Sequence, residues 1–413
     1  SVLVIAIYSL LFGKRSRLIR EFLPYLSILG VYLFWRWQVL GGLGSGATEY
    51  VFNFLIQEST WVRILTTFKI LGLYLFRLVW PWPLSVDYSF NQISAVSSPL
   101  DPGFLVPLVA LILLIGAFAA TLRRRPVVAF GIAWFLSIGS LIFLNGLFPY
   151  GVLFAERLVY LPGIGLALAA TSVLARATLE KPIPRVLPFA TAAAVVLTAF
   201  VWSTVDRNRD WADNLALFSS AVRVSPLSTV SHGNLATELF RLGRYDEAGD
   251  HFRQAIAIFP GYAQGHRGLG YVALAKNDPI TALDHFRECA ILAPDDEETH
   301  IAFATALMRL ERFEEAREAL EYALTLNPRT AKTYHNLGFI ASRIGDTNGA
   351  IRYYERALTI DPTAPQILLN LGISYESQGR MQEANEMFER FLATPPGRFE
   401  KQKAAVRRRM SGG

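Results

Sequence analysis

The stretch YDEAGDHFRQAIAIFP, residues 245–260, contains a pattern that recurs through the second half of the chain. In it, the small residue Ala248 is followed four residues later by the large residue Phe252, and Pro260 closes the stretch. The closing proline recurs every 34 residues, at Pro226, Pro260, Pro294, Pro328, Pro362 and Pro396. An alanine lets two helices approach closely, a large residue fills the space beside it, and a proline ends a helix. The pattern therefore predicts a series of similar helix pairs.

The other positions of the pattern recur with the same period. The alanines are Ala248, Ala282, Ala316, Ala350 and Ala384, and the large residues are Phe252, Phe286, Leu320, Tyr354 and Phe388. This pattern resembles the tetratricopeptide repeat (TPR). It predicts five repeats, at residues 229–262, 263–296, 297–330, 331–364 and 365–398. A connecting half-repeat at residues 206–228 would precede them, and a basic tail at 399–413 would follow.

A solenoid of this kind presents a concave surface to an extended partner, so we expect a protein or peptide to bind there. Asn234, Asn336 and Asn370 share one position on the first helix of their repeats. A carboxamide both donates and accepts hydrogen bonds, which suits the main chain of a bound peptide. Bonding between helices or between repeats explains the same residues equally well, and both interpretations stay open.

Two features that suggest chemistry have simpler explanations. His232, His266 and His300 are 34 residues apart, but helix packing holds such positions roughly 10 Å apart. Zinc needs nitrogens at about 2.0–2.1 Å, so we interpret these histidines as packing or surface residues and expect no metal site. Cys289, the single cysteine, takes the place of a small alanine and is predicted to be buried. The sequence contains no nucleotide-binding or hydrolase motif, and no cofactor is identified.

The first half of the chain is apolar and basic. Residues 1–205 carry fifteen Lys and Arg against seven Asp and Glu, a net charge of +8. A membrane-spanning helix needs about 20 mostly apolar residues, and five segments qualify: 22–40, 102–122, 126–144, 158–175 and 186–205. Segment 64–80 is weaker because Lys69 and Arg77, on one side of a helix, interrupt it. The sequence therefore predicts an all-α chain, with a polytopic membrane domain at residues 1–205 followed by a TPR α-solenoid.

The basic clusters predict the orientation in the membrane. Lys and Arg gather on the cytoplasmic side of membrane proteins, and the clusters lie at residues 14–20, 123–125 and 176–185. All three reach that side only if segment 64–80 is a re-entrant or interfacial helix. Residues 80–89, residues 154–160 and everything after Val205 would then lie outside the cytoplasm. Because the positive charge has this topological explanation, we expect no nucleic acid partner.

A charged pair interrupts two uncharged runs of this half. Glu156 and Arg157 stand between residues 126–155 and 158–175, neither of which contains Asp, Glu, Lys or Arg. Taken alone, the pair is typical of side chains that cap a helix end or reach back to the lipid headgroups.

Three stretches resemble the transmembrane-and-TPR (TMTC-like) family and its bacterial relatives. They are YLFRLVWPWPLSVDYSF (74–90), AERLVYLPGIG (155–165) and RNRDWADNLALFSSAVRVSP (207–226). The resemblance implies a membrane glycosyltransferase of the GT-C fold. It also implies transfer of a sugar from a polyprenyl-phosphate donor to a protein acceptor on the non-cytoplasmic face, and the eukaryotic members are protein O-mannosyltransferases. The family's catalytic carboxylate lies in the first external loop, so we expect a truncated GT-C-like domain here, with an unknown catalytic residue upstream of residue 1.

The resemblance gives the charged pair a second interpretation. A polyprenyl phosphate places its phosphate at the membrane surface, and a planar guanidinium suits phosphate oxygens. Arg157 is then the main candidate for binding the donor phosphate, Glu156 would orient it, and Tyr160 would add a hydroxyl donor. Asp87 would line the donor or acceptor side of the site, although a carboxylate that caps the next turn explains it equally well. The need for a divalent metal stays open.

Two other functions remain possible for this organisation. A membrane-anchored TPR scaffold would assemble an envelope complex, and a polysaccharide ligase or polymerase would also use a polyprenyl-linked donor. A bare anchor needs one span rather than several, which favours the transferase. We expect an integral protein of a bacterial inner membrane, in contact with the lipid bilayer, with its TPRs in the periplasm or outside.

Overall fold

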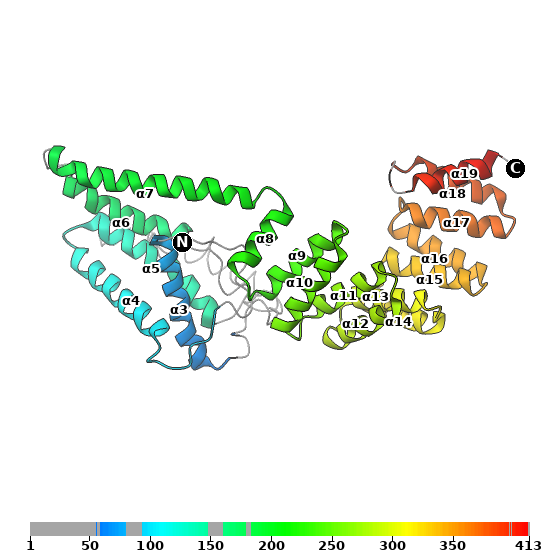
Figure 1. Ribbon diagram of the computed structural model, residues 1–413, viewed down its shortest axis with the longest axis horizontal. Helices are drawn as coiled ribbons and strands as arrows, with labels where there is room; N and C mark the ends of the chain where they lie inside the picture. The colour runs from blue at the N-terminus through cyan, green and yellow to red at the C-terminus, as the bar shows by residue number, and fades with distance from the viewer. Residues whose placement is uncertain are drawn as a thin grey trace, which may run out of the picture. The chain divides into compact units, whose positions relative to one another are not determined.

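The computed structural model describes residues 55, 58–79, 93–147, 160–178, 183–395, 397 and 399–411 (Figure 1). The regular secondary structure of these residues is helical throughout. The described chain divides into two compact units. The first contains the described residues up to Glu238 together with residues 257–260, and the second contains residues 239–256 and everything after residue 260.

The first unit contains α3 (Thr60–Val79), α4 (Pro102–Thr121), α5 (Pro126–Leu147), α6 (Tyr160–Thr178), α7 (Ile183–Asp210) and α8 (Asn214–Val224). α4 begins with a proline at its first position, and the Asp101 side chain accepts a hydrogen bond of 2.6 Å from Gly103 N. Asp213 starts α8 in the same way, accepting from Ala216 N at 2.8 Å. α7 runs without a break past Val205, and α8 follows within the predicted half-repeat.

Small residues let the helices of this unit pack closely. A Cβ added to Gly72 of α3 would lie 2.4 Å from Pro107 Cγ, so α3 and α4 meet at this pair. Val128 and Ile132 of α5 and Ala169 of α6 form a small buried cluster with partly buried residues of α4 and α5.

α4 is the one helix among the described residues that is both long and apolar enough to cross a membrane. It has 20 residues and a mean hydropathy of 2.6. Several of its large apolar side chains are exposed, including Val106, Ile112 and Leu113. Shorter apolar stretches lie in α5 and α6, at Pro126–Ser137 and Pro162–Val173.

The chain between α3 and α4 folds back onto α3. Lys69 Nζ donates to Ser94 Oγ at 2.6 Å and to the Ser94 carbonyl at 3.0 Å. Val96 N donates to the buried Thr66 Oγ1 at 2.9 Å. The charge of Lys69, which interrupts the apolar pattern of this segment, is therefore bound by protein groups.

The repeats follow the predicted periodicity. α9 (Thr229–Arg241) starts at the first predicted repeat boundary and α10 (Tyr245–Ile258) follows it. The next pairs are α11 (Ala263–Ala275) with α12 (Pro279–Leu292), α13 (Glu297–Arg309) with α14 (Phe313–Leu326), α15 (Ala331–Arg343) with α16 (Thr347–Ile360), and α17 (Pro365–Ser377) with α18 (Met381–Ala393). The first helix of every pair begins at a residue where a repeat was predicted to begin.

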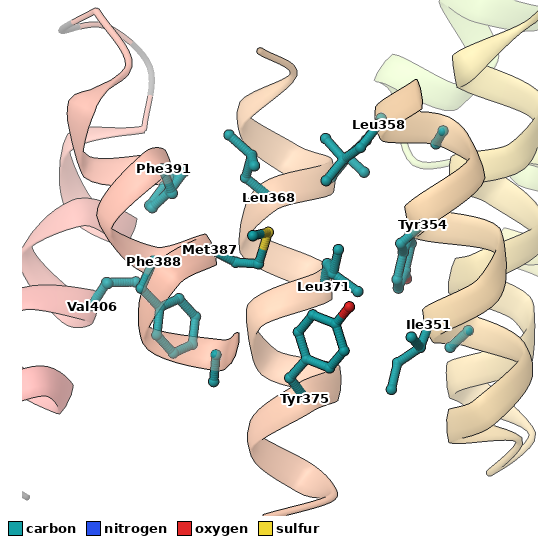
Figure 2. Close-up of a cluster of buried hydrophobic side chains, with 14 of the residues drawn as sticks. Ile351, Tyr354, Leu358, Leu368, Leu371, Tyr375, Met387, Phe388, Phe391 and Val406 are labelled. Atoms are coloured by element: carbon teal, nitrogen blue, oxygen red, sulfur yellow. The ribbon is translucent and has the colours of Figure 1, made fainter. Parts of the chain in front are cut away.

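The small and large residues that recur in each repeat pack against one another, as their spacing predicted. Ala282, Ala316 and Ala350 are fully buried. A Leu–Gly pair recurs on the first helix of several repeats, and its glycine makes room for the large residue of the following helix. A Cβ on Gly270 would lie 2.4 Å from Phe286 Cε1, and one on Gly338 would lie 2.6 Å from Tyr354 Cε1. Figure 2 shows Tyr354 of α16, Leu371 and Tyr375 of α17 and Phe388 of α18 in the resulting core.

The turn inside each repeat requires a left-handed backbone at one fixed position. The residues there are Gly243, Asn277, Glu311, Gly345 and Gly379, with φ from 58° to 87°. Glycine adopts this conformation without strain, whereas Glu311 does so against its preference.

The basic tail forms a further helix, α19 (Glu400–Ser411), for which the sequence pattern gave no prediction. Its buried Val406 packs beside α18, as Figure 2 shows, and Phe399 and Met410 join the same cluster. Lys403 is 3% exposed. Its ammonium donates to the carbonyls of Leu392, Thr394 and Pro395 at the end of α18, the first and last at 3.3 Å.

Candidate functional site

The candidate donor-phosphate residues lie mainly outside the described residues. Asp87, Glu156 and Arg157 fall between described segments. Tyr160 is the first residue of α6. Their predicted roles therefore stay predictions.

The two glycines of the YLPGIG stretch place the first turns of α6 against two other helices. A Cβ on Gly163 would lie 2.7 Å from Leu78 Cδ2, at the end of α3. A Cβ on Gly165 would lie 2.4 Å from the carbonyl oxygen of Gly131 in α5. Pro162 is buried beside them. The stretch therefore fixes the start of α6 at a junction with α3 and α5, which the sequence analysis did not predict.

Arg77 is a half-buried residue near the end of α3, one residue before Leu78. Its guanidinium carbon is 5.9 Å from the centre of the exposed Phe76 ring. Its Nη1 atom is buried, and no group in the described part of the structure accepts a hydrogen bond from it. In the sequence, Arg77 is only a charge inside an apolar segment, and the burial of its Nη1 atom depends on contacts that sequence spacing does not give.

The three asparagines proposed to bind a peptide at the concave surface of the TPR array differ in their surroundings. Asn370 Nδ2 on α17 is 3.0 Å from His335 Nε2 on α15, so this carboxamide joins two successive repeats. Asn336 is half-buried on α15, next to His335. Burial lowers the pKa of His335, and the Asn336 carboxamide opposes that shift. Asn234 is half-buried on α9, in the first unit. The arrangement of Asn370 fits bonding between repeats.

A second polar cluster links three successive repeats on their first helices. Glu298 of α13 accepts hydrogen bonds from Tyr271 Oη of α11 at 3.0 Å and from Lys332 Nζ of α15 at 2.6 Å. Burial, followed by the charge of Glu298, raises the pKa of Tyr271, so it is a neutral donor near pH 7. This cluster was not predicted from the sequence, although Glu298 and Lys332 are 34 residues apart and share one repeat position.

The periodic histidines and the cysteine have structural roles. His232 Nε2 and His300 Nε2 lie 3.1 Å and 2.7 Å from the carbonyls of the prolines six residues earlier. Cys289 is 1% exposed, as predicted for its small-residue position. Its Sγ is 3.2 Å from Thr299 Oγ1, and burial raises the pKa of the thiol.

Comparison with known families matches both parts of the chain. The family model described as "Protein O-mannosyl-transferase TMTC, DUF1736" matches residues 55–115, which include α3 and most of α4. Tetratricopeptide repeat models match residues 206–263, 234–297, 295–363 and 345–408.

This chain aligns with only part of the length of each individual relative. Protein O-mannosyl-transferase TMTC1 of Mus musculus is 26% identical over 263 residues, 63% of this chain and 27% of that protein. Protein FlbA of Caulobacter vibrioides is 34% identical over 103 residues, 25% of this chain and 17% of that protein. The solved structure titled "Functional Characterization of Pseudomonas Aeruginosa pilF" is 19% identical, with a TM-score of 0.41, and covers 45% of this chain and 83% of that chain.

The chain thus combines a TMTC segment with tetratricopeptide repeats. It is homologous to the TMTC protein O-mannosyl-transferases, and it spans less than a third of the length of each of the two curated relatives above. This homology supports a glycosyltransferase-like function at the level of the family.

Proposed function

We propose that this chain is part of a membrane glycosyltransferase that transfers a sugar from a polyprenyl-phosphate donor to a protein acceptor. The observation that carries the proposal is the order of its parts: a TMTC segment at residues 55–115 precedes an array of TPRs in one chain. The homology with protein O-mannosyl-transferases supports the same class of reaction.

The first unit is proposed to be a polytopic membrane domain. The exposed apolar surface of α4 supports a lipid environment, because a soluble protein rarely leaves so large an apolar area uncovered. α5 and α7, of 22 and 28 residues, are long enough to span a bilayer of ordinary thickness. With the basic clusters on the cytoplasmic side, the TPRs would lie on the other side of a bacterial inner membrane.

The donor phosphate is proposed to bind at the outer end of α6, near the charged pair that precedes this helix. Arg157 would hold the phosphate oxygens, Glu156 would orient the guanidinium, and Tyr160 and Asp87 would complete the polar surroundings. Support comes from the uncharged runs on both sides of the pair, since a guanidinium at the membrane interface binds phosphate more strongly than one in bulk water.

The TPR array is proposed to recruit the protein acceptor. Asn336 and Asn234 are half-buried on the first helices of their repeats, and we propose that their carboxamides bond to the acceptor peptide. Asn370 would have to exchange its hydrogen bond to His335 for one to the peptide. The Tyr271–Glu298–Lys332 cluster adds polar groups to the same helices.

Two measurements test the proposal. Mass spectrometry of envelope proteins, with and without the full-length gene, should show hexose that depends on the gene. An unchanged modification pattern would favour a TPR scaffold, and a change confined to polysaccharide would favour a ligase or polymerase.

The second measurement is donor affinity of the full-length protein in nanodiscs. Arg157→Lys keeps the charge but loses the bidentate fork, so it should weaken binding while preserving the fold. Arg157→Ala should weaken binding by about 2–5 kcal/mol. If affinity is unaltered in the alanine variant, Arg157 does not bind the donor; a loss of stability alone would indicate a structural pair with Glu156.

A further inference from the structure

The first helices of the repeats lie on the inner side of the array. Within the second unit, the first helices of successive repeats contact one another directly, α11 with α13, α13 with α15 and α15 with α17. Successive second helices meet less extensively. A stack of helix pairs that packs more closely on one side bends towards that side, so the first helices form the concave surface.

The two layers of helices differ in charge. The five first helices carry five Lys and Arg against four Asp and Glu, a net charge of +1, whereas the five second helices carry six against thirteen, a net charge of −7. The four carboxylates of the first helices are buried or bound by neighbouring side chains: Glu238, Glu297, Glu298 and Glu376. The concave surface is therefore the more electropositive of the two, and it favours an anionic partner.

Two arginines of this surface can offer their charge to a partner. Arg309 and Arg343 are the last residues of α13 and α15, share one repeat position and are exposed. Among the described residues, no carboxylate pairs with Arg309. Arg343 donates to the exposed Glu311 at 2.7 Å. Its guanidinium carbon also lies 5.3 Å from the centre of the Phe313 ring and 5.9 Å from that of the Phe339 ring, which hold the cation in place without neutralising it.

The spacing of the two arginines suits an extended chain. Packed helices have axes about 8–10 Å apart, and an extended segment rises about 3.3 Å per residue. Carboxylates three residues apart in such a segment are therefore separated by about the distance between α13 and α15. A guanidinium binds a carboxylate through a charge-assisted hydrogen bond.

We propose that Arg309 and Arg343 bind an acidic, extended segment of a partner protein, through two carboxylates three residues apart. The identity of this segment as part of the protein acceptor rests on the proposed function, whereas the preference for an acidic segment rests on the charges of the first helices. Arg343, already held by two aromatic rings, loses little freedom when the segment binds.

The test measures the binding of labelled synthetic peptides to the full chain in phosphatidylcholine nanodiscs by fluorescence anisotropy. The probe is a short peptide of serine and threonine with two glutamates three residues apart. One comparison peptide has lysines in place of the glutamates, and another has the two glutamates side by side. The probe should bind most tightly, and added salt should weaken its binding because exposed charges are screened. Equal binding of the lysine peptide would overturn the proposal, and equal binding of the peptide with adjacent glutamates would overturn the proposed spacing.

Arg309→Gln and Arg343→Gln should each weaken binding of the probe by about threefold or more, and together by about tenfold or more. The matched control is Arg352→Gln, which removes an equal charge from an exposed position on the second helix α16 and should leave the affinity unchanged. A thermal melt accompanies each variant, because Arg343 also pairs with Glu311. If Arg343→Gln melts early, Arg309→Gln decides the question, since it breaks no ion pair. Unaltered affinity in Arg309→Gln and in the double variant, or an equal loss in Arg352→Gln, would overturn the proposal.

Other occupants of the surface would be recognised in the same experiment. Tighter binding of a single-stranded oligonucleotide that depends on the two arginines, or self-association of the chain that the double variant loses, would overturn the assignment to an acidic segment of a partner protein. Probe binding that depends on both arginines, in a protein that adds no hexose to envelope proteins, would refute the proposed function alone. Normal hexose transfer by a double variant that no longer binds the probe would refute the assignment of the segment to the acceptor.

Discussion

Gly165 of α6 and Gly131 of α5 approach each other so closely that a Cβ added to either would lie 2.4 Å from the carbonyl oxygen of the other. Main-chain atoms cannot rotate away as a flexible side chain can. Two helices that cross at this distance therefore need glycine on both sides. The crossing therefore fixes the position of the first turns of α6 against α5.

Gly165→Ala is expected to force α5 and α6 apart. Overpacking of this kind costs about 1–3 kcal/mol, so the full chain in detergent should melt at a lower temperature. The matched control is Gly116→Ala in α4, where an added Cβ meets nothing within 4 Å. Equal melting temperatures for the two variants would show that the α5–α6 crossing is looser than the structure indicates.

Ala316→Trp is expected to separate the helices of the third repeat. Ala316 is fully buried and belongs to a core cluster that spans α11 to α15. A large side chain there should cost on the order of 1–3 kcal/mol or more. Glu318→Trp, at an exposed position of the same helix, is the control. Denaturant unfolding of residues 206–413 measures both, and an unchanged midpoint for Ala316→Trp would contradict the burial of this site.

The repeats were predictable because their packing is local and periodic. Ala316 and Leu320 lie four residues apart on one helix, so spacing alone indicates a buried pair. Bonding between repeats was one of the two interpretations of Asn370, but its partner His335 was not predictable, because the contact depends on how one repeat rotates relative to the next. The same holds for Gly163 and Leu78, which meet only after α3 and α6 have packed.

The helix α19 was missed for a related reason. Its sequence is highly charged, and its buried or partly buried side chains are Lys403, Val406 and Met410, while Arg409 pairs with Glu376 of α17 at 3.0 Å. Such a narrow apolar stripe in a basic segment reads as an exposed tail. The sequence singled out Arg157 by its isolation among uncharged residues, whereas the burial of the Arg77 Nη1 atom could be recognised only from the structure.

The TPR array is expected to lose stability in mild acid because of His335. Burial lowers the pKa of this imidazole from its usual 6.5. The unfolded chain therefore binds more protons at pH values just below 6.5, and the stability is full above that pH and falls as the pH drops through it. Burial also lowers the pKa of His232 and His285, so these two residues act in the same direction.

His335→Gln should reduce this pH dependence. Thermal melts of residues 206–413 between about pH 7.5 and about pH 5.5 measure it. Between these two pH values, the melting temperature of the variant should fall less than that of the unsubstituted array. Glutamine keeps a polar group near Asn370, so the comparison isolates the titration. Parallel curves for the two proteins would rule out a contribution from His335.

Lys403 is expected to hold α19 on the last repeat. Its ammonium is buried and donates to three carbonyls at the end of α18, which have no further turn of helix to satisfy them. Lys403→Met keeps the aliphatic stem but leaves these carbonyls unsatisfied, at a cost of about 1–3 kcal/mol.

The exposed Lys401→Met on the same helix is the control for charge.

Residues 206–413 should form a helical domain that unfolds cooperatively. Residues 206–398 should remain helical but unfold at a lower denaturant concentration, because Phe388 and Phe391 lose the cover of Val406. The Lys403→Met midpoint should lie between those two proteins, with Lys401→Met matching the longer one. Equal stability of the long and short proteins would mean that α19 does not cap the array in solution. A Lys403→Met midpoint equal to that of Lys401→Met would mean that the buried ammonium adds nothing to the docking of this helix.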